Sequence, residues 1–300
     1  MLSHIPLIKL RLMLTLLFLL HPLALLGQDG LPTIAINNPA LGDGLGTSAP
    51  RNLNLGLLQA EMEASFTATR KFQVISRNKS TLKTIRDEQN LAQSDFAAGD
   101  AAATGEISNA NYFLLPVVQD FVFARVHRDM PNIDNKYFRT DSGRLSVSAQ
   151  MIDTTTGQVV ATYSMKDGFA TKRKVVNSKG GSPDTTQFAR MAKNVATELA
   201  DLFVDAVFPM KVVSRNRRGN ITINRGSDGG LKLGQVLDVF YVGDELIDPD
   251  TGKSLGSEEE YVGRVEVIRI NPKFTVTKIV KEEDSTNSPI GVGDILRRPQ

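Results

Sequence analysis

The chain has 300 residues, of which 41% are hydrophobic and 23% charged, a composition typical of globular proteins rather than disordered, fibrous or polytopic membrane proteins. The formal net charge is only +2, and no long run of Lys and Arg alternates with aromatic residues, which argues against nucleic acid as the partner. Cysteine is absent, which excludes disulfides, thiolate metal sites, cysteine nucleophiles and the lipid-bearing cysteine of bacterial lipoproteins.

The N-terminus has the order of a cleavable secretory signal. Lys9 and Arg11 precede an apolar run over residues 12–20, and the small residue Gly27 follows a second apolar run. The uninterrupted run is shorter than the roughly 20 residues that span a bilayer. We therefore predict a signal peptide over residues 1–27 and a periplasmic protein, with association to the outer membrane as an option. A signal alone does not separate the periplasm from the medium.

Residues 28–209 alternate between strand-like and helical patterns. Strands are indicated by β-branched and aromatic residues with a period of two, and helices by apolar residues three and four positions apart. The predicted elements are a strand at 33–37, a helix at 55–70, a strand at 71–77, a helix at 80–97 with Ser80 as N-cap, a long buried strand at 110–126, a hairpin of 145–151 and 159–163, and a helix that begins at Ser182-Pro183 and ends near Phe208-Pro209.

From Met210 onward the helical period disappears and short strands alternate with Gly, Asp and Asn turns. Closure into a small β-barrel of roughly ninety residues is the economical solution, because closure removes exposed strand edges. The predicted fold is therefore α+β, with a three-layer-type α/β domain and a mixed sheet at 28–209 and a small all-β, SH3-like barrel at 210–300. The predicted strands of the barrel are 220–224, 236–242, 262–270 and 273–280.

Histidine offers little capacity for catalysis. His4 and His21 lie within the predicted signal, so a Ser-His-Asp device in the mature chain could use only His127. That residue stands between Arg125 and Arg128 in a polar stretch. We expect a solvated histidine at a loop or strand end and no catalytic role.

The triplet Asp250-Thr251-Gly252 matches that of aspartic proteases, which need a second carboxylate close enough to share a proton. Asp248 and Pro249 before it are typical of a turn, and the similar string at 153–157 has two extra residues and lies in the other predicted domain. A hydrolase that uses Asp250 is therefore the third and weakest hypothesis. Hairpin turns are expected at both strings.

Asp248, Asp250 and the glutamates at 258–260 could also offer oxygen ligands to a calcium ion. Gly252 and Lys253, however, occupy positions where an EF-hand loop needs a third ligand and its glycine. We predict no catalytic, cofactor or metal site, and whether an ion binds near Asp248 and Asp250 stays open. The glycine-rich string 226–232 lacks the Gly-Lys-Ser/Thr ending of a phosphate loop and is interpreted as barrel turns.

Two short basic clusters are the remaining candidates for binding. One is Lys172-Arg173-Lys174, and the other consists of Arg215, Arg217 and Arg218. Either cluster could contact an anionic partner such as an envelope polymer or lipid headgroups, and a solvated face is the alternative.

The element order and three strings of the first predicted domain resemble the periplasmic α/β domain of the CsgG, LpoB and TolB amino-terminal group. The strings are FQVISR at 72–77, NANYFLLP at 109–116 and the hairpin AQMIDTTTGQVV at 149–160. The resemblance covers residues 31–209. It implies a protein that works in the cell envelope.

The second predicted domain is similar to the carboxy-terminal barrel of the flagellar assembly protein FlgT, through the strings GNITIN at 219–224, GSDGGLKLG at 226–234, DPDTG at 248–252 and GVGD at 291–294. Both resemblances imply a non-enzymatic protein whose domains bind other proteins or surfaces. No functional residues carry over from either family.

One departure separates the chain from CsgG, a lipoprotein pore with a membrane hairpin at each of two insertions in this domain. The corresponding stretches, 126–144 and 167–183, are read as short charged loops without two strands of nine or more residues. The predicted function is thus an exported accessory or assembly protein that binds protein partners of an envelope assembly, with homo-oligomers, peripheral membrane contact and contact with an envelope polymer as options. A ring-forming outer-membrane secretion component of the CsgG kind is the alternative.

Overall fold

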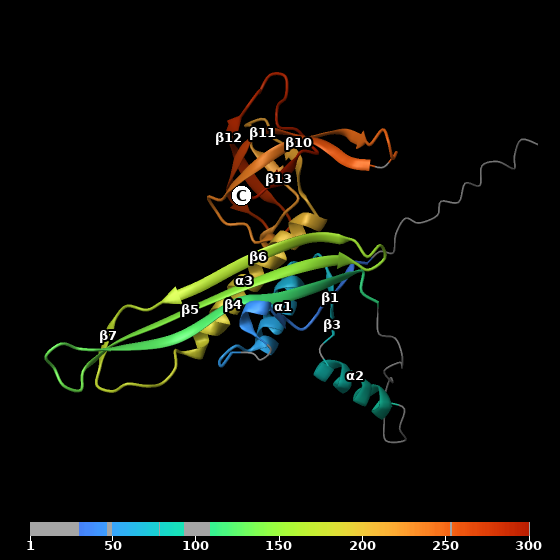
Figure 1. Cartoon of the computed structure of the whole chain (residues 1–300). Coiled ribbons are helices and arrows are strands. Elements are labelled where there is room, and N and C mark those ends of the chain that lie inside the picture. Colours follow the sequence, from blue (N-terminus) through green and yellow to red (C-terminus); the bar gives the residue numbers. More distant parts are fainter. Residues whose placement is uncertain (1–29, 47–49, 78, 93–108, 253, 300) are drawn as a thin grey trace, which may run out of the picture. The chain divides into compact units, whose positions relative to one another are not determined.

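A computed structural model describes residues 30–46, 50–77, 79–92, 109–252 and 254–299 (Figure 1). The predicted signal peptide lies outside these residues. Among the described residues, no helix combines the length and the apolar character needed to cross a membrane.

The first part of the described chain is built on a seven-stranded mixed sheet. Its central order is β3-β1-β4-β5-β6, with β2 paired to β4 and β7 paired to β5. β1 runs parallel to β3 and β4, whereas β4, β5 and β6 form an antiparallel meander. The strands are β1 (Thr33–Ile36), β2 (Ala40–Leu41), β3 (Gln73–Ser76), β4 (Tyr112–Asp129), β5 (Tyr137–Asp153), β6 (Val159–Ala170) and β7 (Lys174–Val176).

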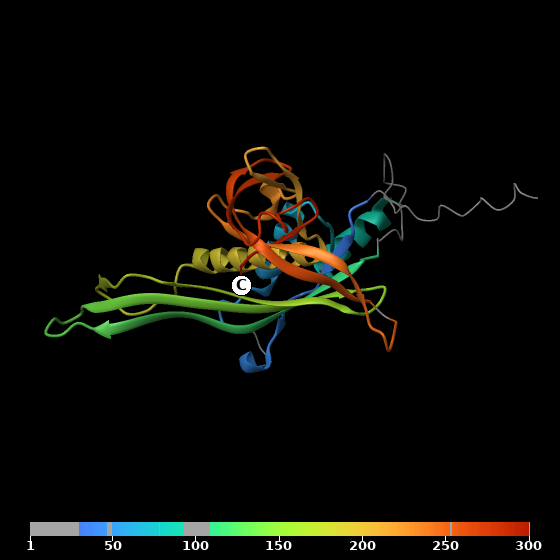
Figure 2. The same cartoon turned by 90° about the horizontal axis from the view of Figure 1, so that it is seen from above.

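Two helices, α1 (Leu55–Ala68) and α3 (Thr185–Val207), pack on one face of this sheet (Figures 1 and 2). Asn54 caps α1 through its side chain, which accepts a hydrogen bond from the Leu57 amide at 2.9 Å. A short 3-10 turn, η1 (Asp43–Leu45), follows β2, and a further helix, α2 (Lys79–Ala92), follows β3. The sheet and the pair α1 and α3 therefore make two layers.

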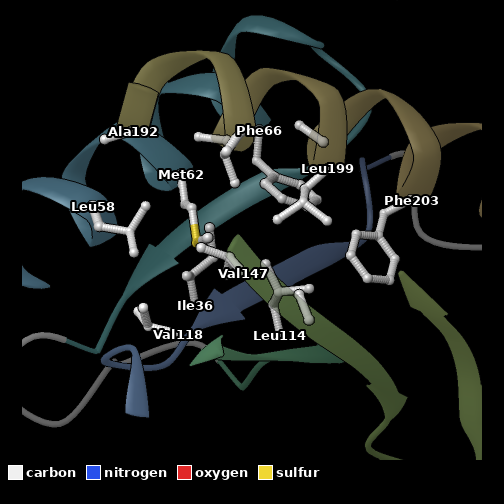
Figure 3. Packing of buried hydrophobic residues seen from close by; sticks show 14 of the residues in the cluster. Ile36, Leu58, Met62, Phe66, Leu114, Val118, Val147, Ala192, Leu199 and Phe203 are labelled. Carbon is white, nitrogen blue, oxygen red and sulfur yellow. The ribbon is translucent and has the colours of Figure 1, made fainter. Parts of the chain in front are cut away.

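The core lies between these two layers (Figure 3). Apolar residues of α1 and α3 at helical spacing meet alternate residues of the strands, so each element buries one face. Full burial of each large apolar side chain contributes about 1.5–3 kcal/mol. The labelled members are Ile36, Leu58, Met62, Phe66, Leu114, Val118, Val147, Ala192, Leu199 and Phe203, all of them buried.

The C-terminal part is a closed antiparallel barrel with its own apolar core. Its strands close in the order β10-β11-β12-β9-β8-β13, and the sequence-based prediction of an α+β protein with a mixed sheet and a small barrel is confirmed. The elements are β8 (Met210–Arg215), β9 (Ile221–Ile223), the 3-10 turn η2 (Ser227–Gly229), β10 (Val236–Ile247), β11 (Ser254–Ile270), β12 (Thr275–Glu282) and β13 (Ile295–Arg297).

Two predicted helix caps are wrong. α3 begins at Thr185, and Asp184 is its N-cap, accepting a hydrogen bond from the Thr186 amide at 2.9 Å. Asp184 takes the cap position because its carboxylate accepts from an amide at the start of the helix, and Ser182 and Pro183 lie before the helix. Ser80 lies inside α2, which begins at Lys79, and therefore does not cap it.

The prediction of a charged loop at 126–144 is also wrong. β4 and β5 stay paired without interruption from Ala124 opposite Ser142 to Asp129 opposite Tyr137, and only residues 130–136 form the tip. Within 126–144, however, the two strands contribute only residues 126–129 and 137–144, so this stretch still lacks two strands of nine or more residues. Residues from Pro32 onward form one compact unit by their contacts, and the proposed domain boundary at residue 209 stays a prediction.

Candidate functional site

The end of the sheet around β7 extends past the start of α3 as an arm (Figures 1 and 2). We call residues 124–142 of the β4–β5 hairpin, together with residues 170–181, the basic arm. β7 adds a third strand to the hairpin, with Tyr137 opposite Val176 and Arg139 opposite Lys174. Three paired strands give the arm a fixed backbone on which side chains can be presented.

Aromatic side chains fix the base of the arm to the body of the sheet. Phe123 of β4 contacts Phe169 of β6 edge to face, with ring centroids 5.7 Å apart, and Phe121 contacts Phe188 in the first turn of α3 at 5.8 Å. Gly143 makes room for this packing, because a Cβ atom there would lie 2.3 Å from Cε1 of Phe169. The arm is therefore continuous with the core rather than a separate flap.

The basic arm is strongly positive compared with the whole chain. It has eight Lys and Arg residues and three Asp residues, a formal charge of +5, whereas the 300 residues together have +2. The basic residues are Arg125, Arg128, Lys136, Arg139, Lys172, Arg173, Lys174 and Lys179, and the acidic ones are Asp129, Asp134 and Asp141.

Three of the nitrogen-bearing side chains form a row across the arm. His127 on β4 pairs with Arg139 on β5, and Arg139 pairs with Lys174 on β7. Residues directly opposite on neighbouring strands have side chains on the same face, about 5 Å apart at Cβ, and like charges so placed are destabilising. The row of His127, Arg139 and Lys174 is thus a place where a bound anion would relieve repulsion.

The nearest carboxylate on that face is already engaged. Arg125 donates to Asp141 through two bonds, Nε to Oδ1 at 2.7 Å and Nη2 to Oδ2 at 2.8 Å, and the Asp141 side chain is only 10% exposed. The hydrogen bonds from Arg125 hold the pKa of Asp141 below its usual value despite the opposing effect of burial. Asp141 therefore stays ionised and paired with Arg125, while Arg139 and His127 lower its pKa further by longer-range attraction without forming an ion pair with it.

Other cations of the arm are positioned by aromatic rings. The Arg173 guanidinium lies 4.9 Å from the centre of the Phe138 ring, and the Lys179 ammonium lies 4.7 Å from that of Tyr137. Lys179 also pairs with Asp129 at 2.8 Å. Within the described residues, no carboxylate lies within 4.0 Å of the charged groups of Arg128, Arg139, Lys172 and Lys174.

Apolar groups accompany the charges. Val126, Ile133 and Val175 are all exposed on the arm. A cavity of about 530 Å³ opens at the base of the arm and is lined by leucines before and within α1 together with Phe123 and Phe188. Val126 and Val175 lie on the opposite face of the arm from the row of His127, Arg139 and Lys174, because successive residues of a strand point to opposite faces. The arm therefore presents cations on one face and exposed aliphatic side chains on the other.

The structure places His127 within β4, half-buried, and not in a loop. Its side chain makes no hydrogen bond among the described residues, so no catalytic device is assembled around it there. Its closest relationship is with Arg139 opposite and with Asp141, whose pKa it helps to lower. His127 is therefore part of the basic row.

The two aspartate strings form hairpin turns, as predicted. Asp248 accepts hydrogen bonds from the Asp250 amide at 2.9 Å and the Thr251 hydroxyl at 2.7 Å, which lower its pKa. Asp153 accepts from the amides of Thr155 and Thr156 in the same way. In the ranges that the structure describes, no three or more His, Asp or Glu residues gather as a metal site.

The residues of the second basic cluster, Arg215, Arg217 and Arg218, have different roles in the structure. Arg215 donates to both carboxylate oxygens of Glu282, at 2.6 and 3.2 Å, and to the Ile290 carbonyl at 3.1 Å, so it is a structural residue of the barrel. Arg217 and Arg218 are exposed beside a cavity of about 650 Å³. Gly226 lies in a tight turn, where a Cβ atom would come within 2.2 Å of the Pro272 carbonyl oxygen.

Sequence reasoning missed one polar cluster, which joins α3 to the barrel. Arg225 is 2% exposed and donates from Nη2 to Asp205 at 2.8 Å, while Arg298 donates from Nε to the other oxygen of Asp205 at 2.8 Å. Asp201 lies beside them, and burial raises its pKa, just as burial lowers the pKa of Arg225. The four residues are scattered between positions 201 and 298, so no local pattern could have indicated the cluster.

No protein-family model and no curated protein matches the sequence. Among solved structures, the chain is similar to the PelC dodecamer from Paraburkholderia phytofirmans, with 15% identity over 57% of this chain and 88% of that one and a TM-score of 0.28. It is also similar to a minor lipoprotein from Acinetobacter baumannii, with 12% identity over 58% and 91% of the two chains and a TM-score of 0.25. TolB from the same organism gives 12% identity over 83% and 57%, again with a TM-score of 0.25.

TolB is named in the resemblance inferred from the sequence, and it is also among these structural neighbours. At TM-scores of 0.25 to 0.28, the likeness assigns neither a family nor a function. The predicted relationships to CsgG and to the FlgT barrel stay predictions.

Proposed function

We propose that this protein is an exported, non-enzymatic accessory or assembly protein of the bacterial cell envelope, and that it binds an acidic protein of a larger assembly through the basic arm. The observation that carries the proposal is the row of His127, Arg139 and Lys174 on three neighbouring strands. Export rests on the signal-like order of residues 1–27.

The row supports binding because it has an energetic cost in the free protein. Cross-strand pairs of opposite charge stabilise a sheet by roughly 0.2–1 kcal/mol, and like charges directly opposite destabilise it. A carboxylate placed between Arg139 and Lys174 would change repulsion into attraction. The three-stranded backbone holds these positions in register, so association needs little backbone ordering, and the ordering cost that remains is that of the Arg and Lys side chains.

A protein partner is favoured over a polyanion by the apolar groups of the arm. Binding to a polyanionic polymer needs cations alone, whereas the basic arm also exposes Val126, Ile133 and Val175, with Val126 and Val175 on the face opposite the row. The cavity at its base, lined by Phe123 and Phe188, would accept an apolar anchor. The expected partner surface is therefore acidic and contains exposed aliphatic side chains.

The experiment compares two charge reversals of equal size in the native host. K172E/K174E reverses two exposed cations of the arm, and R217E/R218E reverses two exposed cations of the barrel. Envelope fractions of each strain are separated into periplasm, membranes and medium and then analysed by gel filtration in aqueous buffer. We expect the wild type and R217E/R218E in the same large species, and K172E/K174E shifted to the size of the free chain.

Two outcomes would overturn the proposal. One is a wild-type protein that elutes at the size of the free chain from every fraction. The other is binding of the purified protein to anionic phospholipid vesicles or to isolated envelope polymer that K172E/K174E abolishes, without any protein in the complex. The second result would identify the partner of the arm as a polyanion rather than an acidic protein.

A ring-forming outer-membrane secretion component remains the second candidate, and one observation favours it. β4 and β5 are 18 and 17 residues long, and their pairing continues past Val126, where the sequence indicated a charged loop. The same fractionation separates the two functions. Extraction of a large ring only with detergent would support the secretion component, whereas recovery of the complex in aqueous buffer would reject it.

A further inference from the structure

The barrel carries a second exposed hairpin, of opposite charge to the arm. Beyond the barrel wall, β10 and β11 continue as a two-stranded ribbon over residues 244–260, which we call the acidic ribbon. Glu245 pairs with Ser257 and Leu246 with Gly256, and the turn at Asp248 closes the end. The described side chains of the ribbon are exposed, apart from the half-buried Asp248.

The acidic ribbon has seven Asp and Glu residues and a single lysine, a formal charge of −6. Glu259 pairs with Arg297 of β13 at 2.7 Å, and Asp248 holds the turn. Within the described part of the chain, the remaining carboxylates have no Lys or Arg nitrogen within 4.0 Å. They are Asp244, Glu245, Asp250, Glu258 and Glu260.

The ribbon also carries apolar side chains that the barrel does not cover. Leu246 and Ile247 are exposed on β10, and Leu255 on β11 is 67% exposed. Large aliphatic side chains at the end of a projecting hairpin cannot join a core in the single chain. They provide the apolar contacts that a charge-steered interface needs in order to persist.

Free strand edges complement the side chains. β2 is the last partner on the outer edge of β4 and ends opposite Val118, so from Asp120 to Asp129 that strand pairs only with β5. The strands of the ribbon pair only with each other beyond Phe240 and Tyr261. Such edges present unpaired backbone donors and acceptors that another strand can use.

From these features we propose that the acidic ribbon of one copy docks on the basic arm of a second copy of this chain. The proposal rests on the proposed function, because it names a partner for the same arm. Formal charges of +5 and −6 meet in the contact, and exposed aliphatic residues lie on both elements. Within one chain, no hydrogen bond or ion pair among the described residues joins ribbon to arm.

The geometry of the contact has a consequence for assembly. Arm and ribbon are different surfaces, so the contact is heterologous and a docked pair of copies still has one free arm and one free ribbon. Addition continues until a ring closes or a chain of copies forms. The ribbon therefore serves as the acidic, aliphatic partner surface that the arm was inferred to bind.

The test uses purified full-length mature protein and sedimentation velocity at low and high salt. We expect multimers at low salt that dissociate at high salt, because the contact depends on exposed charges. K172E/K174E on the arm and E258K/E260K on the ribbon should each weaken self-association by about tenfold or more. Circular dichroism and a melting curve establish that both variants are folded.

Mixing the two variants is the decisive step. In the mixture, the unchanged ribbon of K172E/K174E, at −6, meets the unchanged arm of E258K/E260K, at +5, whereas the altered arm, at +1, and the altered ribbon, at −2, attract each other only weakly. The mixture should therefore form one-to-one dimers that neither variant forms alone. A wild type that is monomeric at every salt concentration, or a mixture that stays monomeric, overturns the inference.

The failure of the self-docking and the failure of the proposed function can be told apart. If E258K/E260K leaves the native-host complex intact while K172E/K174E disrupts it, and the purified wild type is monomeric, the arm binds another protein and only the self-docking is refuted. If K172E/K174E changes neither the host complex nor self-association, both proposals fail.

Discussion

Arg225 at the bottom of the barrel donates to Asp205 of α3, Nη2 to Oδ1 at 2.8 Å, and the same nitrogen donates to the Phe208 carbonyl oxygen at 2.6 Å. At 2% exposure, Arg225 is among the largest fully buried side chains of the protein. Its Nε has no hydrogen-bond partner among the described residues, so the bonds of Nη2 to Asp205 and Phe208 are what compensates its burial. The attachment of the barrel to α3 thus depends on a buried ion pair.

Replacement of Arg225 by methionine should lower the free energy of unfolding by about 3 kcal/mol, because a buried carboxylate loses its partner. This loss of unfolding free energy is at the low end for the removal of one partner of a buried ion pair, because Arg298 still donates to Asp205. Urea denaturation followed by circular dichroism measures the loss. Arg218→Met, an exposed site, is the control, and equal stability of the two variants would contradict this role of Arg225.

Gly230 should tolerate alanine less well than Gly219. Both have positive φ, +65° and +79°, so either alanine costs about 1 kcal/mol of backbone strain. Only at Gly230 would the new Cβ meet another group, Asp201 Oδ2 at 1.8 Å, which adds about 1–3 kcal/mol of overpacking. Thermal unfolding of the two variants gives the difference, and G230A/D201A should recover part of it. Equal melting temperatures for G230A and G219A would refute the close packing on Asp201.

Asp141 makes the stability of the arm sensitive to acid. Its pKa is held below the ordinary value of 3.8 by Arg125, so the folded state favours the ionised carboxylate. The resulting stabilisation is complete above about pH 4 and is lost as the pH falls through the lowered value. D141N should therefore be less stable than the wild type at pH 7, with the difference closing below pH 3.8.

Melting curves of wild type and D141N between pH 2 and pH 7 test that expectation. D134N, at the exposed tip of the arm, is the control and should follow the wild type throughout. A stability difference between D141N and wild type that stays constant over the acid range would show that the carboxylate acts by packing rather than by charge.

Asp201 should give the opposite dependence on pH. Burial raises its pKa above 3.8, so the folded state binds the proton more tightly than the unfolded chain. Wild-type stability then decreases as the pH rises from about 4 through the raised value. D201N removes that decrease and should be more stable than the wild type at pH 7, with no advantage in acid. Calorimetry at pH 3.5 and pH 7 measures the stability of both proteins. A D201N variant that is less stable than the wild type at pH 7 would contradict this expectation, because it would show that the contact of Asp201 with Arg298 outweighs the cost of burying the carboxylate.

The sequence indicated the body of the sheet well because its elements have one buried face. α1 and α3 repeat apolar residues at helical spacing, and residues such as Leu114 and Val147 lie on long strands whose buried positions alternate. The barrel was predictable as a class because turns recur at short intervals. β13, which like β9 has only three residues, carried no period that could be recognised.

The arm and the polar cluster were harder to predict for physical reasons. Along β4, Arg125, His127 and Asp129 alternate with Val126, and a strand that is exposed on both faces looks like a charged loop. Arg225 and Asp205 are far apart in the sequence, and each resembles an ordinary surface residue. Only the packing of α3 against the barrel makes Arg225 a buried residue.

Photo-crosslinking in the native host tests whether the basic arm is the binding surface. A photoreactive phenylalanine analogue replaces Val126 or Val175 on the arm, or Val159 on β6 as the control, all three being exposed. If the partner binds the basic arm, we expect a discrete protein adduct at Val126 and at Val175, and none at Val159. The adducts at the arm should disappear when the K172E/K174E substitutions are also present. Adducts at Val159 but not at the arm, or arm adducts that charge reversal leaves unchanged, would contradict it.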